Sequence, residues 1–424
     1  MSARELLLGS FAAAVAAADP LQIVPAHLPP PPRGRTVVVG AGKAAGAMAL
    51  AVERHWPAAA PLEGLVITRY GHGLPTERIR VVEAGHPVPD ESGEAAAREI
   101  LRRAGELAPD DLLLVLVSGG GSSLLSLPVE GVAMEELKAV TRQLLASGAP
   151  IQDMNTVRKH LSLIQGGRLA AATRARVLAL VISDVTGDDP THIASGPCAA
   201  DPSTFAEARA ILAHFGVRPP TGIAAHLEAG VAGRVPETPK PGDPALAHAD
   251  NRVIATARAS LAAAAAYFQG RGVTPMVMGD SVTGESSEVA KVFAAFARQL
   301  RHHGHPVHPP VAVISGGETT VTLRGSGGRG GRCSEFLLSL GVEMAGLEAT
   351  WALACDTDGI DGSEDNAGAV LAPDSLDRAR ALGLDARRLL AANDAYGFFA
   401  ALGDLVVTGP TRTNVNDYRV VLIR

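Results

Sequence analysis

The chain has 424 residues, a length that predicts two or three domains. Hydrophobic residues make up 47% of it and charged residues 19%, a composition typical of a globular protein with an ample core. The net charge of −6 gives no basic surface for nucleic acid, and no apolar run is long enough to span a bilayer. Three widely spaced cysteines argue against a disulfide scaffold and a structural zinc site. Together with the lack of a signal-peptide pattern, they predict a cytoplasmic protein.

A first glycine-rich turn follows a predicted helix at 2–18, a polyproline linker at 29–32 and a strand at 36–39. This turn, at 40–46, resembles a dinucleotide-binding fingerprint. Its third glycine comes one residue late, however, and the next strand carries no acidic residue at its end. The turn is not a Walker A loop either, because no serine or threonine follows Lys43. A lysine at this place can put its ammonium group on a phosphate.

A second turn is the strongest candidate for an anion-binding loop. The apolar strand at 112–117 breaks directly into three glycines and two serines. Where side chains are lost at the carboxyl end of a strand, backbone N–H groups can approach a ligand, and the hydroxyls add donors. A phosphate suits this arrangement best, and the alternative is a flexible turn. The loop consists of Ser118, Gly119, Gly120, Gly121, Ser122 and Ser123.

Two polar segments of the first half are candidates for substrate contacts. His86 lies in a loop fixed by two prolines and is either a ligand contact or a partner of local backbone groups. Asn155 and Arg158 are three residues apart and therefore share a helix face. That face could hold an acidic substrate, and the alternative is a solvated basic surface.

The strand predicted at 177–183 leads to Asp184 and Asp189. Acidic residues at the carboxyl end of a strand are typical Mg²⁺ ligands or general bases in phosphoryl-transfer sites, although they also cap turns. Ser195 and Gly196 then form another loop of small residues.

The Pro-, Gly- and Ala-rich segment at 218–243 indicates a domain boundary, which we place between domains 1–238 and 239–424. Strands, loops and helices alternate in both halves. This alternation predicts α/β layers with mostly parallel sheets in each domain.

In the second half, Glu318 follows a short apolar strand, and a glycine- and arginine-rich loop at 325–332 ends in Arg332. Asn414 lies shortly before the last predicted strand. Lys43 and Arg332 both lie beside glycines, so each is expected to reach an anion unobstructed.

Motifs along nearly the whole chain, in the same order, resemble the glycerate 2-kinase family, the bacterial class II type with a C-terminal MOFRL domain. In this family the glycine–glycine–arginine loop usually continues with Asn-Gln, whereas Cys333 and Ser334 stand here. The motifs that carry the resemblance are Gly40–Ala44, Gly85–Asp90, Ser118–Ser122, Asn155–Ser162, Ser183–Val185 with Gly187–Asp188, Ser195–Pro197, Ser315–Glu318 and Asp356–Gly362.

The resemblance implies two Rossmann-like α/β domains with the active site in the cleft between them. It also implies transfer of the γ-phosphoryl group of ATP to the 2-hydroxyl of D-glycerate with Mg²⁺. In this interpretation the catalytic residues are Lys43, Asp189 and Arg332, and Mg²⁺ is held by Asp184 and Asp189, whose roles the sequence cannot separate. Substrate and nucleotide contacts would come from Gly42, His86, Ser118, Gly119, Gly120, Gly121, Ser122, Asn155, Arg158, Ser195, Gly196, Glu318 and Asn414.

Two other classes of function stay open. One is an NAD(P)H-dependent hydroxypyruvate reductase, which the fingerprint-like turn and Arg69 favour, and the other is a non-catalytic binding protein. For the oligomeric state, a homodimer is one option. The expected partners are therefore ATP and a small 2-hydroxy acid, with neither nucleic acid nor a membrane.

Overall fold

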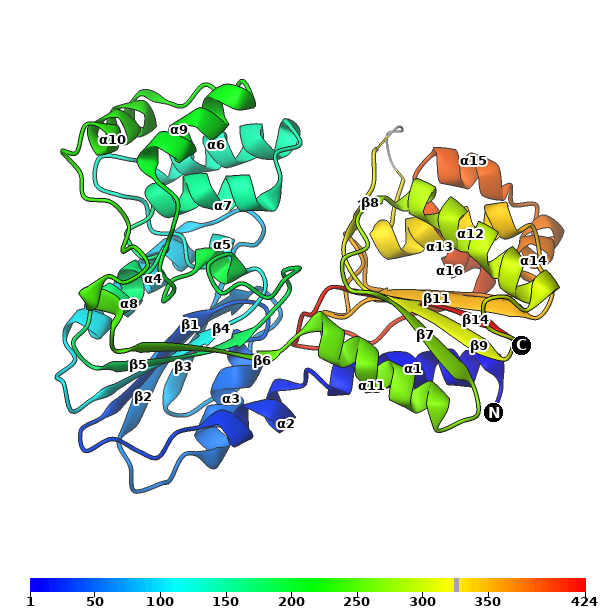
Figure 1. The fold of residues 1–424 in the computed structure, drawn as a ribbon, viewed down its shortest axis with the longest axis horizontal. Coiled ribbons are helices and arrows are strands. Elements are labelled where there is room, and N and C mark those ends of the chain that lie inside the picture. Colours follow the sequence, from blue (N-terminus) through cyan, green and yellow to red (C-terminus); the bar gives the residue numbers. More distant parts are fainter. Residues whose placement is uncertain (324–327) are drawn as a thin grey trace. The chain divides into compact units, whose positions relative to one another are not determined.

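A computed structural model describes residues 1–323 and 328–424, so residues 325–327 of the predicted glycine- and arginine-rich loop lie outside the described part. The chain divides into two compact units (Figure 1). One unit is residues 20–254. It is called the kinase-like unit here because most of the motifs that resemble the glycerate 2-kinase family lie in it. The other combines residues 1–19 with 255–424 and is called the C-terminal unit. This division differs from the expected boundary between 238 and 239.

The kinase-like unit is built on a six-stranded parallel sheet with the strand order β3-β2-β1-β4-β5-β6. The strands are β1 (Thr36–Ala41), β2 (Leu62–Arg69), β3 (Ile79–Ala84), β4 (Leu112–Val117), β5 (Arg176–Ile182) and β6 (Ala249–Ala255). Its helices are α2 (Pro20–Ile23), η1 (Val24–His27), α3 (Ala45–His55), α4 (Glu91–Gly105), α5 (Gly121–Leu124), α6 (Met134–Ala146), α7 (Ile151–His160), α8 (Arg168–Ala171), η2 (Ile193–Ser195), α9 (Phe205–His214), α10 (Thr221–Val231) and η3 (Pro244–Leu246).

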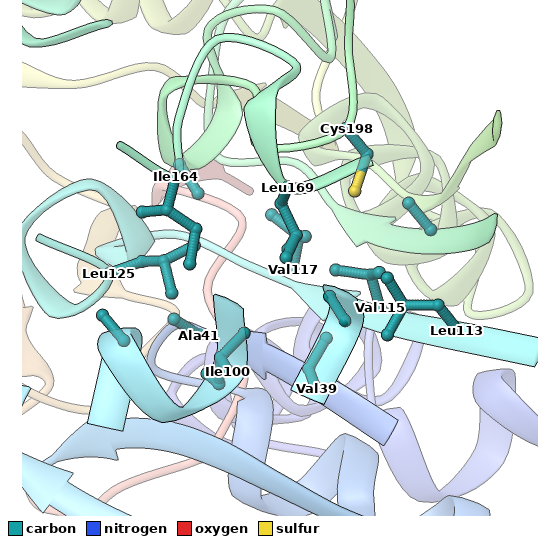
Figure 2. Packing of buried hydrophobic residues seen from close by; sticks show 14 of the residues in the cluster. Val39, Ala41, Ile100, Leu113, Val115, Val117, Leu125, Ile164, Leu169 and Cys198 are labelled. Atoms are coloured by element: carbon teal, nitrogen blue, oxygen red, sulfur yellow. The ribbon is translucent and has the colours of Figure 1, made fainter. Parts of the chain in front are cut away.

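Strands β1 and β4 form the centre of this sheet and are buried on both faces. They pair in parallel with Ala41 opposite Val117, so the two turns that follow them start side by side. Alternate residues of both strands pack beneath α4 and beneath the segments that follow β4 and α7. Figure 2 shows this packing around Val39, Val115, Leu125 and Ile164, among other residues. The apolar core therefore fixes the position of the loop after β4.

Helices α6, α7, α9 and α10 form a separate layer of the same unit with an apolar core of its own (Figure 1). A buried ion pair ties this layer together, because Lys159 Nζ lies 2.7 Å from Asp201 Oδ1 and both side chains are excluded from solvent. Asp201 also accepts hydrogen bonds from Ser203 and from Thr238. The carboxylate thereby joins α7 to the chain on both sides of α9 and α10.

The C-terminal unit contains a six-stranded sheet with the order β13-β12-β11-β14-β9-β7 and a two-stranded sheet of β10 and β8. The strands are β7 (Thr274–Gly279), β8 (Gly284–Glu285), β9 (Val311–Ser315), β10 (Thr319–Thr320), β11 (Thr350–Asp356), β12 (Gly368–Leu371), β13 (Leu405–Val406) and β14 (Asp417–Ile423). The helices are α1 (Ala3–Ala16), α11 (Ala257–Gln269), α12 (Ser286–His303), α13 (Arg332–Met344), α14 (Ser375–Ala381), α15 (Ala386–Ala391) and α16 (Ala395–Leu402).

The prediction of a mostly parallel sheet is wrong for this unit. Strand β14 runs antiparallel to both β11 and β9, and β12 runs antiparallel to β11. Only β7 and β9 pair in parallel among the described strands of the large sheet. Two neighbouring strands are parallel only when the connection between them crosses over the sheet, usually through a helix. No helix lies between β11 and β12, so a general alternation of strands and helices does not fix their relative direction.

Helix α1 belongs to the C-terminal unit although it begins the chain. It packs with α11 against one face of the sheet, where Leu7 and Phe11 join Tyr418 in a shared core. The Tyr418 hydroxyl donates a hydrogen bond to Ser10 Oγ (2.8 Å), and Arg4 pairs with Asp404 (2.9 Å). No single described helix is long and apolar enough to cross a membrane, although α1 and the bent segment at 20–27 meet the length and composition test together.

We expect Gly40→Ala to destabilise the kinase-like unit. A Cβ at this position would lie 1.9 Å from the carbonyl oxygen of Leu116, and the backbone φ of +151° disfavours a side chain. Overpacking and backbone strain together should cost roughly 2–4 kcal/mol, which thermal denaturation followed by circular dichroism would detect. Gly105→Ala is the control, because its Cβ meets only ordinary contact at 3.7 Å and should leave the melting temperature unchanged or slightly raised.

Candidate functional site

The turn after β1 is packed tightly against the end of β4. A Cβ on Gly42 would lie 2.1 Å from Ser118 Oγ, so only glycine fits. The backbone amides of this turn are already used: Gly42 donates to Ile67 O (3.1 Å), Lys43 to Gly119 O (2.9 Å) and Ala44 to Ser118 Oγ (3.0 Å). The glycines therefore serve the contact between two strands, and these amides are not available to a ligand.

The loop after β4 has the opposite character. Its amides at Gly119 and Gly120 donate to no other residue that the structure describes. Gly120 adopts a left-handed φ of +81°, and a Cβ there would lie 2.8 Å from His86 Nε2 and 3.4 Å from Lys43 Cγ. Lys43 and His86 therefore flank the glycine with open amides. A cation and two N–H donors at one sheet edge form a suitable surface for an anion.

A chain of partly or fully buried hydrogen bonds starts at the same loop. Ser122 Oγ lies 2.9 Å from Ser195 Oγ, and Ser195 donates to Asn155 Oδ1 (3.1 Å). Arg158 Nη1 donates to the same oxygen (3.3 Å), while Asn155 Nδ2 donates to the carbonyl oxygen of His192 (3.1 Å). The structure thus brings together three of the predicted segments, from the β4 loop, α7 and η2.

The η2 segment is held in an unusual backbone conformation. Ala194, Ser195 and Gly196 have φ values of 50°, 57° and 58°. Left-handed backbone is costly for residues other than glycine and persists where the surroundings enforce it. Here the Ser195 hydroxyl is fully buried in the hydrogen-bond chain, and the Ser195 carbonyl accepts from the Gly166 amide (3.0 Å). The strain places Ser195 against Ser122.

Asp184 and Asp189 lie on the loop between β5 and η2, as expected for acidic residues at a strand's carboxyl end. Asp189 is exposed, and its Oδ1 accepts a hydrogen bond from the Thr191 amide (2.8 Å). Within residues 1–323 and 328–424, no group of three or more histidine, cysteine, aspartate or glutamate side chains is placed to hold a metal ion. A metal at these carboxylates would need oxygens from a ligand as well.

The remaining candidates lie in the C-terminal unit, where Arg332 does not have the unobstructed reach expected of it. Its Nε pairs with Asp417 (2.8 Å), Nη2 with Asp356 (2.7 Å) and Nη1 with Glu318 (3.1 Å). Burial alone would lower the pKa of Arg332, but these carboxylates raise it above its usual value. Arg332 is thus a permanently charged residue in a carboxylate cage, because β11 ends in Asp356 and the adjacent strand β14 begins with Asp417.

Asn414 is buried in the loop before β14, and its Oδ1 accepts from the Asn416 amide (3.3 Å). Glu318 is the exposed member of the Arg332 cage. These two residues and Arg332 therefore form a second set of candidates, separate in the chain from the set around Gly120.

Sequence reasoning missed three residues at the site. Ser162 and Gln165 line a pocket with Arg158, and Gln165 Nε2 donates to the carbonyl oxygens of Ser122 (2.8 Å) and Leu125 (3.1 Å). His192 supplies the carbonyl that orients Asn155. Ser162 lies at the end of the motif Asn155–Ser162, but no local signal marks Gln165 or His192, because both act through contacts with residues far away in the sequence.

Comparison with known proteins places these features in a class of two-domain α/β proteins. Residues 6–228 match the family described as "Domain of unknown function (DUF4147)", and residues 311–417 match the MOFRL family. A protein of Agrobacterium vitis named "Putative hydroxypyruvate reductase" is 52% identical, over 100% of this chain and 95% of its own. The glycerate 2-kinase of Pyrococcus horikoshii is 38% identical, over 92% of this chain and 88% of its own.

The crystal structure of glycerate kinase from Thermotoga maritima superimposes with a TM-score of 0.87 and 35% identity. The match covers 99% of both chains. The chain therefore belongs to the glycerate kinase family with a DUF4147 N-terminal and a MOFRL C-terminal domain.

We expect His192 to make the stability of the site loop depend on pH. Burial, followed by the nearby Lys159 charge, lowers the pKa of His192, and its Nδ1 is buried without a hydrogen-bond partner among the described residues. The folded state therefore favours neutral His192. Its stabilising contribution is present above the unfolded pKa of about 6.5 and is lost as the pH falls below that value.

The measurement is the melting temperature between pH 7.5 and pH 5.5. His192→Gln should show a smaller decrease over this range than the unmodified protein, whereas His302→Gln, at an exposed position of α12, should show the same decrease. An unchanged pH dependence in His192→Gln would contradict the assignment.

Proposed function

We propose that this protein is an ATP- and Mg²⁺-dependent kinase that phosphorylates the 2-hydroxyl of D-glycerate to give 2-phosphoglycerate. Phosphoryl transfer needs positioned cations and open N–H donors more than covalent chemistry. The observation that carries the proposal is the grouping of Lys43 and His86 around Gly120, beside the unused amides of Gly119 and Gly120. Relatives named glycerate 2-kinase over most of the chain support it.

The second candidate is an NAD(P)H-dependent hydroxypyruvate reductase. The name of the Agrobacterium vitis relative and the strand order 3-2-1-4-5-6, which dinucleotide-binding sheets share, favour it. The turn after β1 argues against a reductase, because a dinucleotide-binding fold needs the backbone amides of that turn to bind the pyrophosphate. Here the amides of Gly42, Lys43 and Ala44 are bonded to Ile67, Gly119 and Ser118. The kinase is therefore the better-supported candidate.

We assign Lys43 to the transferred phosphoryl group and the loop Ser118–Ser122 to phosphate or glycerate. Asp184 or Asp189 would accept the proton of the attacking hydroxyl. Mg²⁺ is compatible with these residues, because it is commonly held by one or two carboxylates together with substrate phosphates and water, and when bound it would neutralise charge on the phosphates. Asp184 and Asp189 would hold it.

Arg332 would be a second cation for phosphate. All three guanidinium nitrogen atoms have carboxylate partners, so to bind a phosphate Arg332 would have to exchange one of these carboxylates for it. Glu318 is the most exposed of these partners and is the one we expect to yield. Asn414 would contribute a polar contact from the loop before β14.

The reaction is tested with purified protein, D-glycerate, ATP and Mg²⁺, coupled to enolase, which consumes 2-phosphoglycerate and not its 3-isomer. Signal with enolase alone is expected. Signal that appears only after a phosphoglycerate mutase is added would contradict the assigned hydroxyl. Oxidation of NADPH by hydroxypyruvate as fast as ATP turnover would overturn the kinase in favour of the reductase, and in that case Arg69→Ala should weaken NADPH binding.

We expect Lys43→Ala to lower kcat at least roughly a hundredfold, with a much smaller change in ATP affinity. A contact to the transferred phosphoryl group stabilises charge that moves during the reaction, and its loss typically costs about 10²–10³ in kcat. Steady-state kinetics and the melting temperature are measured together, and the latter should stay close to that of the unmodified protein. Lys43→Arg should restore activity only in part, since a planar guanidinium cannot place a point charge equally well.

An alanine variant that keeps more than about a tenth of kcat would exclude Lys43 as the transition-state cation. Arg332 would then be the better candidate.

A further inference from the structure

A narrow pocket lies between α7, α6 and the loop after β4, entirely within the kinase-like unit. Its lining includes Arg158 of α7 and serines that follow β4. The complete lining is Pro87, Pro89, Ser122, Ser123, Ser126, Leu127, Leu137, Thr141, Arg158, Ser162 and Gln165.

Arg158 is a cation without a carboxylate partner among the residues that the structure describes. Among the described residues, its side chain donates one hydrogen bond, from Nη1 to Asn155 Oδ1, so most of its five N–H donors have no partner there. Burial lowers the pKa of Arg158 to about 10, which leaves it protonated at neutral pH. By contrast, Arg332 has three carboxylate partners. An arginine held half-buried without a counter-charge is suited to bind an anion from solution.

The hydroxyl groups of the pocket have fixed roles. Asn155 Oδ1 cannot donate, so Ser195 uses its single hydroxyl hydrogen on that oxygen. Ser122 must therefore donate its own hydrogen to Ser195, and its remaining lone pairs can only accept. Ser123 is likewise committed as a donor to Gly120 O (3.1 Å). The β4 side of the pocket thus offers acceptors.

Two neighbouring side chains complete the pattern. Gln165 uses its amide nitrogen on Ser122 O and Leu125 O, which leaves its side-chain oxygen as an acceptor. Ser162 Oγ accepts from the amides of Ile164 and Gln165, both at 3.2 Å, so its hydroxyl hydrogen is left to donate. The pocket therefore combines two donors, the charged guanidinium of Arg158 and the hydroxyl of Ser162, with acceptor oxygens at Ser122 and Gln165.

This pattern discriminates between ligand classes. A carboxylate accepts hydrogen bonds and a hydroxyl donates one, so a hydroxy acid matches both sides of the pocket. A phosphate oxygen would face the acceptors of Ser122 and Gln165 unfavourably.

We propose that this pocket is the acceptor-substrate subsite, in which Arg158 binds the carboxylate of a small hydroxy acid and Ser122 Oγ accepts a hydrogen bond from one of its hydroxyls. The assignment rests on the proposed function for the identity of the acid, and it separates the acid subsite from the phosphate-binding surface at Gly120 and Lys43. Arg158 would then select acids over neutral polyols.

The test is Arg158→Gln, with binding and turnover measured separately. Loss of a charge-assisted contact predicts D-glycerate binding weakened at least about tenfold by calorimetry, a similar rise in its KM, and a KM for ATP changed by less than about threefold. Glyceramide, the neutral analogue, should bind both proteins equally. Arg158→Lys should restore binding in part. Arg142→Gln, at an exposed arginine of α6, is the matched control and should behave like the unmodified protein.

Ser122→Ala tests the other half of the pocket. The unmodified protein should prefer D-glycerate to propionate, which has the carboxylate and no hydroxyl, and Ser122→Ala should narrow that preference. If Arg158→Gln does not fold, Arg158→Lys and Ser122→Ala decide the question.

Unchanged glycerate binding and KM in the Arg158 variants would overturn the subsite, as would an equal loss for glyceramide. Failure of the proposed function has a different signature. The unmodified protein would then bind D-glycerate or hydroxypyruvate through Arg158 and yet transfer no phosphate.

Discussion

The close contact between the ends of β1 and β4 is the constraint on which the candidate site depends. Gly40 and Gly42 leave no room for a Cβ against Leu116 and Ser118, and the parallel register sets Ala41 opposite Val117. The backbone amides of the turn after β1 consequently donate hydrogen bonds to β2 and to the residues that follow β4. The loop after β4 keeps its glycine amides open, and Lys43 is carried to its side. One packing contact thus decides which of two glycine-rich turns can serve an anion.

Hydrogen bonds between polar side chains connect the loop after β4 to the layer of helices that contains α7. The chain Ser122–Ser195–Asn155–Arg158 links the sheet edge to α7 through partly or fully buried hydrogen bonds. These bonds restrict the side-chain orientations, because an unsatisfied polar group in the interior is costly. The ion pair of Lys159 and Asp201 anchors the other side of α7. Adjacent residues of one helix therefore have different roles: Lys159 is paired with Asp201, whereas Arg158 has no carboxylate partner among the described residues.

In the C-terminal unit, by contrast with Arg158, Arg332 and Arg419 are paired with carboxylates. Arg332 begins α13 among three carboxylates, two of them deeply buried at the ends of β11 and β14. Arg419 pairs with Asp417 as well. Charge there is balanced within the protein itself. Glycines beside a basic residue in the sequence therefore do not show that its charge is available to a ligand, since that depends on which carboxylates the fold places nearby.

The sequence by itself determined the α/β class, the two-domain organisation and the family, because strand–loop–helix alternation and ordered motifs are local properties of the chain. The site residues named from it stay predictions. Tertiary structure alone decided the antiparallel strands of the C-terminal sheet, the membership of α1 in that unit, the cage around Arg332 and the roles of Ser162 and Gln165. Each of these depends on contacts between residues far apart in the chain. Hydrophobic periodicity reports which face of an element is buried, but it does not report which partner covers that face.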